Sequence, residues 1–86
     1  MPEISRFFGI VIAMYWVEHG PPHFHARYGG YKVTIAIDSL TVLEGSFPPR
    51  VLGFVVEWAS QHQKELAGNW EKARLNRALK KIAPLQ

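Results

Sequence analysis

The chain has 86 residues, 48% of them hydrophobic and 20% charged, with a formal net charge of +3. This length and composition predict a single globular domain, because the apolar fraction is typical of folded proteins and a chain of this size buries about 60% of its surface. The absence of cysteine excludes disulfides and cysteine-ligated zinc. The longest apolar run, residues 7–17, falls short of the roughly 20 residues that a membrane-spanning helix needs. We therefore expect a soluble, cytoplasmic protein without membrane contact.

The first half of the chain is typical of short antiparallel strands. Residues 7–16 are rich in β-branched and aromatic side chains, which favours a buried strand that ends on Trp16 in the core. Gly29-Gly30 suits a two-residue hairpin turn between the strands on either side of it. The expected strands are, in chain order, residues 7–16, 23–28, 31–38 and 40–45. We predict a three- to four-stranded antiparallel meander over residues 7–45.

The second half of the chain changes to helical periodicity. Pro48-Pro49 suits a helix start, and apolar residues then recur at helical spacing. The pattern predicts one long C-terminal helix, with a break or bend near Gly68. The expected boundaries are residues 49–79 for the helical part and 80–86 for an irregular tail, within one domain that spans residues 1–86. The predicted fold class is α+β, with the helix packed on one face of the sheet.

The stretch EHGPPHFHARYGGY, residues 18–31, holds three of the four histidines. Side chains alternate between the two faces of a strand, so residues 23–28 should place one set of side chains on each face of the sheet. One face of the sheet is expected to carry His23, His25 and Arg27. The other set is Phe24, Ala26 and Tyr28, with Phe24 as the anchor in the core.

Three histidines so close together are candidate metal ligands. His23 and His25 point the same way from a strand and would grip one ion, with His19 as a third ligand folded back across the prolines. Glu18 or His62 would complete the set. A His-x-His pair alone is a weak signal, and the alternative is that the imidazoles hold the Pro-Pro loop by hydrogen bonds to backbone carbonyls. No cofactor is expected, with a divalent metal as the alternative.

The same strand also suits acid–base chemistry on RNA, in which the ribose 2′-hydroxyl attacks the phosphate. His23 and His25 would transfer protons near neutral pH, and Arg27 would hold the phosphate through paired hydrogen bonds. Tyr28 and Tyr31 would stack on bases. The sequence leaves open whether the protein is an enzyme, because inert strands carry such residues too.

A third hypothesis is a binding module without chemistry. The chain carries no acidic residue after Glu71, and a basic end of this kind attracts phosphates or an acidic partner. The predicted binding residues are Trp70, Lys72, Arg74 and Arg77, together with Tyr28 and Tyr31. The alternative is a solvated last helical turn whose cations complement the helix dipole.

Three segments resemble one small bacterial family: SRFFGIVIAMYWVEHGPPHFHARYGGY, LEGSFPPRVLGFVVEWASQHQKEL and NWEKARLNRALKKIAPL. With its PPHFHA core, the chain is identified as a member of the family called domain of unknown function 4160. The resemblance implies a short bacterial protein whose gene neighbours a second small gene, in the manner of toxin–antitoxin pairs. It carries over no catalytic residue.

The leading hypothesis is therefore a component of such a two-gene module. Its partners would be the cognate small protein from the neighbouring gene and RNA, and homo-oligomerisation is left open. The alternative is a histidine-dependent metal-binding protein, or a small hydrolase or nuclease, that uses His19, His23 and His25.

Overall fold

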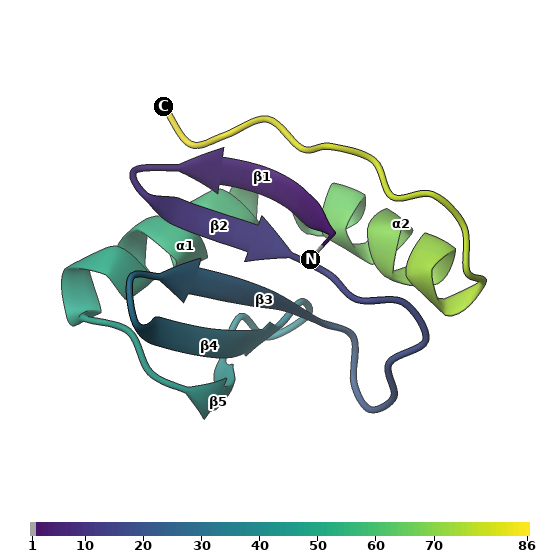
Figure 1. Cartoon of the computed structure of the whole chain (residues 1–86), viewed down its shortest axis with the longest axis horizontal. Helices are drawn as coiled ribbons and strands as arrows, with labels where there is room; N and C mark the ends of the chain where they lie inside the picture. The colour runs from purple at the N-terminus through teal and green to yellow at the C-terminus, as the bar shows by residue number, and fades with distance from the viewer. Residues whose placement is uncertain (1) are drawn as a thin grey trace.

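The computed structural model describes residues 2–86, which form an antiparallel sheet followed by two helices (Figure 1). The strands are β1 (Glu3–Phe7), β2 (Ile10–Ala13), β3 (His23–Tyr28), β4 (Tyr31–Ala36) and β5 (Val42–Gly45), and the helices are α1 (Pro49–Gln61) and α2 (Gln63–Arg74). Each strand pairs antiparallel with the next one along the chain, in the order β1-β2-β3-β4-β5. The predicted α+β meander is confirmed, with five strands in the sheet.

The additional strand is β1, most of which lies before residue 7, and a turn interrupts the single strand that was predicted over residues 7–16. Phe8 and Gly9 have positive φ angles of 52° and 78°, the conformation of a two-residue hairpin turn, so β1 folds back on β2. The sequence hides this turn because a bulky residue such as Phe8 rarely adopts a left-handed backbone. β2 ends at Ala13, and Trp16 therefore lies in the following loop with 42% of its surface exposed. The prediction of a core Trp16 was wrong.

The helical part is broken at a different place from the one predicted. α1 and α2 meet at His62, whose φ of −131° lies outside the helical region, whereas Gly68 lies within α2. A single glycine is tolerated inside a helical pattern. α2 ends at Arg74, before the predicted limit of residue 79, because Asn76 adopts a positive φ and the next N–H groups bond back to the last helical carbonyls. Within residues 2–86, no helix is long and apolar enough to cross a membrane.

The core lies between the sheet and the two helices, and in Figure 1 α1 lies behind the sheet. Trp58 of α1 is fully buried, with its ring centroid 5.5 Å from that of Phe7 and 6.0 Å from that of Phe24. Burial of a large apolar side chain such as Phe24 contributes roughly 1.5–3 kcal/mol. Because Phe24 faces this core, the alternation along β3 leaves His25 and Arg27 on the open face of the sheet.

One edge of the sheet is covered by another segment of the chain, and the other edge is exposed. The C-terminal segment, residues 75–86, runs beside β1 (Figure 1), where the N–H of Ile82 donates to the carbonyl of Ile4 at 2.8 Å. β5 forms the other edge, and all of its residues are exposed. Of the two edges of the described sheet, only that of β5 is therefore left free for another chain.

Candidate metal centre

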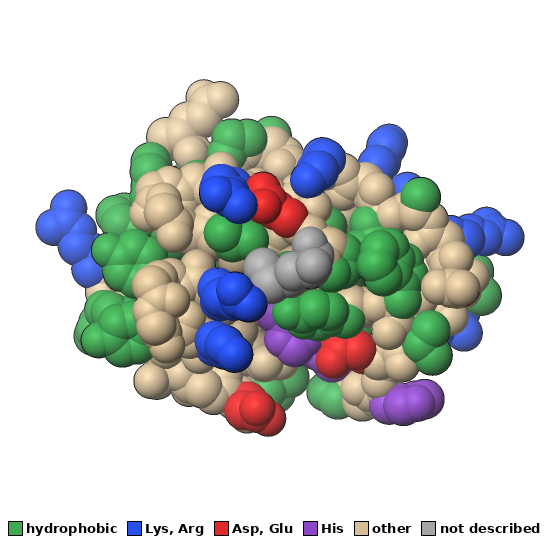
Figure 2. All heavy atoms as spheres, viewed as in Figure 1, with side chains coloured by type: hydrophobic (Ala, Val, Ile, Leu, Met, Phe, Trp, Pro, Cys, Tyr) green, Lys and Arg blue, Asp and Glu red, His purple; other side chains and the backbone are tan. Residues whose placement is uncertain are grey.

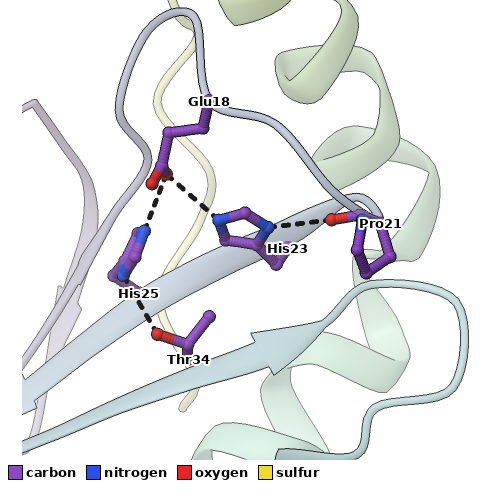
Figure 3. A network of polar contacts seen from close by, with 5 residues as sticks. All are labelled: Glu18, Pro21, His23, His25 and Thr34. Carbon is purple, nitrogen blue, oxygen red and sulfur yellow. Dashed lines mark hydrogen bonds and ion pairs between the residues drawn. The ribbon is translucent and has the colours of Figure 1, made fainter. Parts of the chain in front are cut away.

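Three side chains with metal-binding atoms converge where the proline loop enters β3 (Figure 3). Glu18 comes from the loop between β2 and β3, and His23 and His25 lie on β3. One carboxylate oxygen of Glu18, Oε1, lies 3.1 Å from His23 Nε2 and 2.7 Å from His25 Nε2. The three ligand atoms lie within 4.8 Å of one another, and no other such trio occurs within residues 2–86. We call these residues the Glu18–His23–His25 group.

His23 is oriented by the loop that precedes it. Its Nδ1–H donates to the carbonyl oxygen of Pro21 at 2.8 Å, because a carbonyl can only accept. This bond fixes the orientation of the ring, and Nε2 is thereby aimed at Glu18. Metal-ligating histidines commonly donate their second ring N–H to a backbone carbonyl in this way. His23 is only 7% exposed, and its ring packs against Trp70 at a centroid distance of 4.9 Å.

His25 is supported from both sides on the open face. Thr34 lies directly opposite it on β4, and the Thr34 hydroxyl oxygen is 3.3 Å from His25 Nδ1. A hydroxyl can either donate or accept, so this contact is kept whichever ring nitrogen carries the proton. The ring of Tyr15 packs edge-to-face against His25 at a centroid distance of 4.7 Å. These contacts restrict the rotation of the imidazole before any ligand binds.

The loop that carries Glu18 is strained and is held in place by α2. Val17 has a φ of 57°, which is unfavourable for a β-branched residue and costs on the order of 1–3 kcal/mol. Its N–H donates to the carbonyl of Ala73 at 3.3 Å, and the indole N–H of Trp16 donates to the carbonyl of Arg77 at 2.8 Å. Backbone strain of this kind clusters at functional sites. Here it sets the direction of the next residue, Glu18.

The donor set of two imidazoles and one carboxylate fits a divalent transition metal. In zinc sites the nitrogen and oxygen ligands lie about 2.0–2.2 Å from the ion, which places them roughly 3–3.5 Å from one another. The Nε2–Oε1 distance of 3.1 Å to His23 lies in that range, whereas the distance of 2.7 Å to His25 is shorter and is that of a hydrogen bond. Two histidines and a carboxylate also leave at least one coordination position open, as in catalytic zinc and non-haem iron sites.

The other predicted metal ligands lie outside this group. His19 is exposed, and its ring nitrogens are not among the converging atoms. His62 lies at the break between the helices, with its Nδ1 2.6 Å from Glu65 Oε1. The structure thus brings two of the three predicted metal ligands, His23 and His25, together with a glutamate.

The residues predicted for RNA chemistry are divided between the two faces of the sheet. Arg27 lies on the open face, as does His25. Tyr28 and Tyr31 pair with each other at the end of the hairpin, and Tyr28 packs against Phe47 of the core. The tyrosines therefore do not share a face with the predicted catalytic residues.

The predicted binding residues in and after the second helix differ in burial and in the contacts that they form. Trp70 is 8% exposed and packs on His23, so its ring supports the candidate centre. Lys72 is half-buried, and the exposed Arg74 donates to Glu71 at 2.8 Å. Arg77 is exposed, and its carbonyl accepts the hydrogen bond from Trp16. No ion pair links these cations to the Glu18–His23–His25 group within residues 2–86.

Two supporting residues, Thr34 and Tyr15, were missed from the sequence. A two-residue loop that pairs Tyr28 with Tyr31 also pairs His25 with Thr34. The contact between His25 and Thr34 could therefore have been predicted from the hairpin. No sequence pattern indicates Tyr15, because its position depends on the path of the loop after β2. Glu18 was considered only as one of two residues that would complete the set.

The comparisons with known proteins place the chain in a family without assigning it an activity. Residues 9–71 match the family model described as domain of unknown function (DUF4160), and the chain belongs to that family. No curated protein and no solved structure matches the chain. The matched range includes the whole Glu18–His23–His25 group.

Proposed function

We propose that this member of the family binds one divalent transition-metal ion, such as zinc, through Glu18, His23 and His25. The observation that carries the proposal is the convergence of both Nε2 atoms on a single carboxylate oxygen, at 3.1 and 2.7 Å. His23 also holds the proline loop through its bond to the carbonyl of Pro21, but that bond uses Nδ1 and leaves Nε2 directed at Glu18. Two imidazoles aimed at one carboxylate form a set of ligands for a cation.

The surroundings of the group support metal binding. The carbonyl of Pro21 and the hydroxyl of Thr34 occupy the Nδ1 atoms, and outer contacts of this kind raise metal affinity by fixing the rings. The side chains of Glu18 and His25 are 29% and 25% exposed, so an ion can reach them from the open face. His23 lies deeper, against Trp70. The group is therefore both preorganised and accessible.

Calorimetric titration of the metal-stripped protein with zinc tests the proposal. We expect one ion per chain, and we expect His23→Ala to abolish binding because only Glu18 and His25 would remain. His62→Ala is the matched control, since His62 also contacts a glutamate but has no third ligand beside it. His19→Ala should bind zinc like the wild type. A wild-type protein that takes up no zinc, or an unchanged affinity in His23→Ala, would contradict the proposal.

The second candidate function is partner binding, as one component of a toxin–antitoxin-like two-gene module in the cytoplasm, with RNA as a further ligand. The observation that favours it is the edge strand β5, where Val42 and Leu43 are 42% and 47% exposed. An uncovered strand edge can accept a strand from another chain. The expected partner is the cognate small protein from the neighbouring gene.

Co-expression with the neighbouring gene, followed by affinity purification and growth assays, tests this second function. We expect the small protein to co-purify with the wild type and to be lost from Leu43→Lys, because a charged side chain blocks apolar contact at the edge. Leu75→Lys is the control, since Leu75 is 51% exposed but lies after α2. Absence of co-purification, or equal loss in both variants, would count against the module.

A further inference from the structure

A hollow of about 170 Å³ lies on the open face of the sheet, beside the Glu18–His23–His25 group. Small side chains from β2, Val11 and Ala13, line it, and longer polar side chains line it from β3 and β4. His25 and Tyr15 line it as well. The hollow and the candidate metal centre therefore share His25.

Arg27 and Lys32 line this hollow from neighbouring strands. They are direct partners in the β3–β4 register, and like charges directly opposite one another destabilise a sheet. Both are exposed, and neither forms an ion pair within residues 2–86. Figure 2 shows Lys and Arg side chains (blue) side by side on this face, close to histidine (purple). Two adjacent cations that form no ion pair attract an anion.

Another cation of the sheet, Arg6 of β1, already has a counter-charge. Its guanidinium donates to the carboxylate of Glu3 at 2.7 and 3.2 Å, and this hydrogen bond, together with the charge of Arg6, lowers the pKa of Glu3. Glu44 lines the hollow from β5 but forms no ion pair with Arg27 or Lys32 in the described chain. The carboxylate of Glu44 offsets only part of the charge of Arg27 and Lys32, so the hollow keeps an excess of positive charge.

We propose that the hollow binds the phosphate group of a phosphate ester, held by Arg27 and Lys32. The arginine fork matches two phosphate oxygens, and the lysine ammonium adds a second charge. The hydroxyl of Thr34 also lines the hollow and can donate a further hydrogen bond. Tyr15 offers an aromatic ring to the rest of the ligand. If a metal ion is bound at the proposed metal site, the ester would lie beside it. Binding of the phosphate group by Arg27 and Lys32 does not depend on the metal.

Calorimetry on the metal-stripped protein at low salt tests the phosphate site, with inorganic phosphate and single-stranded hexauridylate as the two probes. We expect Arg27→Gln and Lys32→Gln each to weaken binding by about tenfold or more, because each removes a charge-assisted hydrogen bond. Lys64→Gln removes an equal charge from an exposed position on α2, and it should weaken binding by less than about twofold since salt screens distant charges. Amide shifts in nuclear magnetic resonance spectra should centre on Arg27 and Lys32.

The remaining variant should move binding in the opposite direction. Glu44→Gln removes the only carboxylate that lines the hollow within residues 2–86, and it should strengthen phosphate binding. Tighter binding of hexauridylate than of inorganic phosphate supports a phosphate ester as the ligand, and the reverse order would contradict it. The proposal is overturned if neither probe binds, if Lys64→Gln is as weak as Lys32→Gln, or if Glu44→Gln weakens binding. Because no metal is present, failure of this test leaves the zinc titration unaffected, and failure of the zinc titration leaves this test unaffected.

Discussion

Within residues 2–86, histidine and glutamate side chains are in contact at two places, which differ in how the fold brings the residues together. At the break between the helices, His62 and Glu65 are three residues apart and 2.6 Å from each other, with the side chain of Glu65 52% exposed. In the proline loop, Glu18 contacts both His23 and His25 on β3. Only this second place brings three ligand atoms within 4.8 Å of one another in the described chain.

This contrast shows which kind of histidine contact indicates a site. Neighbours three residues apart on a helix meet without help from the rest of the fold, so the contact between His62 and Glu65 carries little information about function. Glu18 follows Val17, whose backbone is strained and bonded to α2, and it contacts histidines five and seven residues away. An arrangement that costs free energy to hold is better evidence of function than a short distance.

The largest expected effect separates the scaffold of β3 from the side chains that it presents. Phe24→Ala should lower the free energy of unfolding by about 3–5 kcal/mol, because it leaves a cavity in the core. His25→Ala and His62→Ala should each lower it less, by about 1 kcal/mol, since their side chains are 25% and 16% exposed and lie outside the core cluster. Urea denaturation measures all three. If His25→Ala is as destabilising as Phe24→Ala, the histidine is a structural residue and the contrast between the two histidine contacts disappears.

The next effect compares the two glutamates directly. Glu18→Gln should weaken zinc binding by at least about 100-fold, because even outer-shell supports are worth about 10–100-fold in metal affinity and Glu18 is a proposed ligand. Glu65→Gln should leave the affinity unchanged. Competition with a chromogenic zinc chelator measures both variants. Equal affinities would show that the carboxylate near the histidines is no more a ligand than the one on the helix.

A smaller effect concerns the support of His25 from β4. Thr34→Val removes the hydroxyl that lies 3.3 Å from His25 Nδ1 and should weaken zinc binding by about tenfold. Valine favours strands, so the fold should be kept, as circular dichroism would check. Thr41→Val changes an exposed threonine whose hydroxyl contacts Ser39, and it should bind zinc like the wild type. Equal weakening in both variants would assign the effect to something other than the contact with His25.

The smallest effect tests the strain that distinguishes the proline loop. Val17→Gly should raise the free energy of unfolding by about 1 kcal/mol, because glycine adopts a positive φ freely and the relief exceeds its entropic cost. Val42→Gly should have the opposite sign, since Val42 lies in β5 and has no positive φ. Thermal unfolding monitored by calorimetry compares the two. A Val17→Gly protein that is less stable than the wild type would mean that the side chain of Val17 contributes more than its backbone costs.

Structural elements that depend only on neighbouring residues could be predicted from the sequence. The Gly-Gly turn and the alternation of β3 and β4 predicted the hairpin, and with it the register that places His25 opposite Thr34. The turn at Phe8 and Gly9 escaped prediction, because a bulky residue adopts a positive φ only when the surrounding structure compensates its cost. The helix break at His62 was not predicted either, because Gly68 is the residue whose type favours a break.

The candidate site, like the fold, could be predicted from the sequence only in part. That His23 and His25 share a face follows from the period of a strand and was predicted. That Glu18 completes the group, and that His19 does not, was decided by the tertiary structure. The loop takes its path from hydrogen bonds to Ala73 at the end of α2 and to Arg77 just after it, more than fifty residues along the chain. No local propensity encodes such contacts, because they exist only after the helix has packed against the sheet and buried Trp70 on His23.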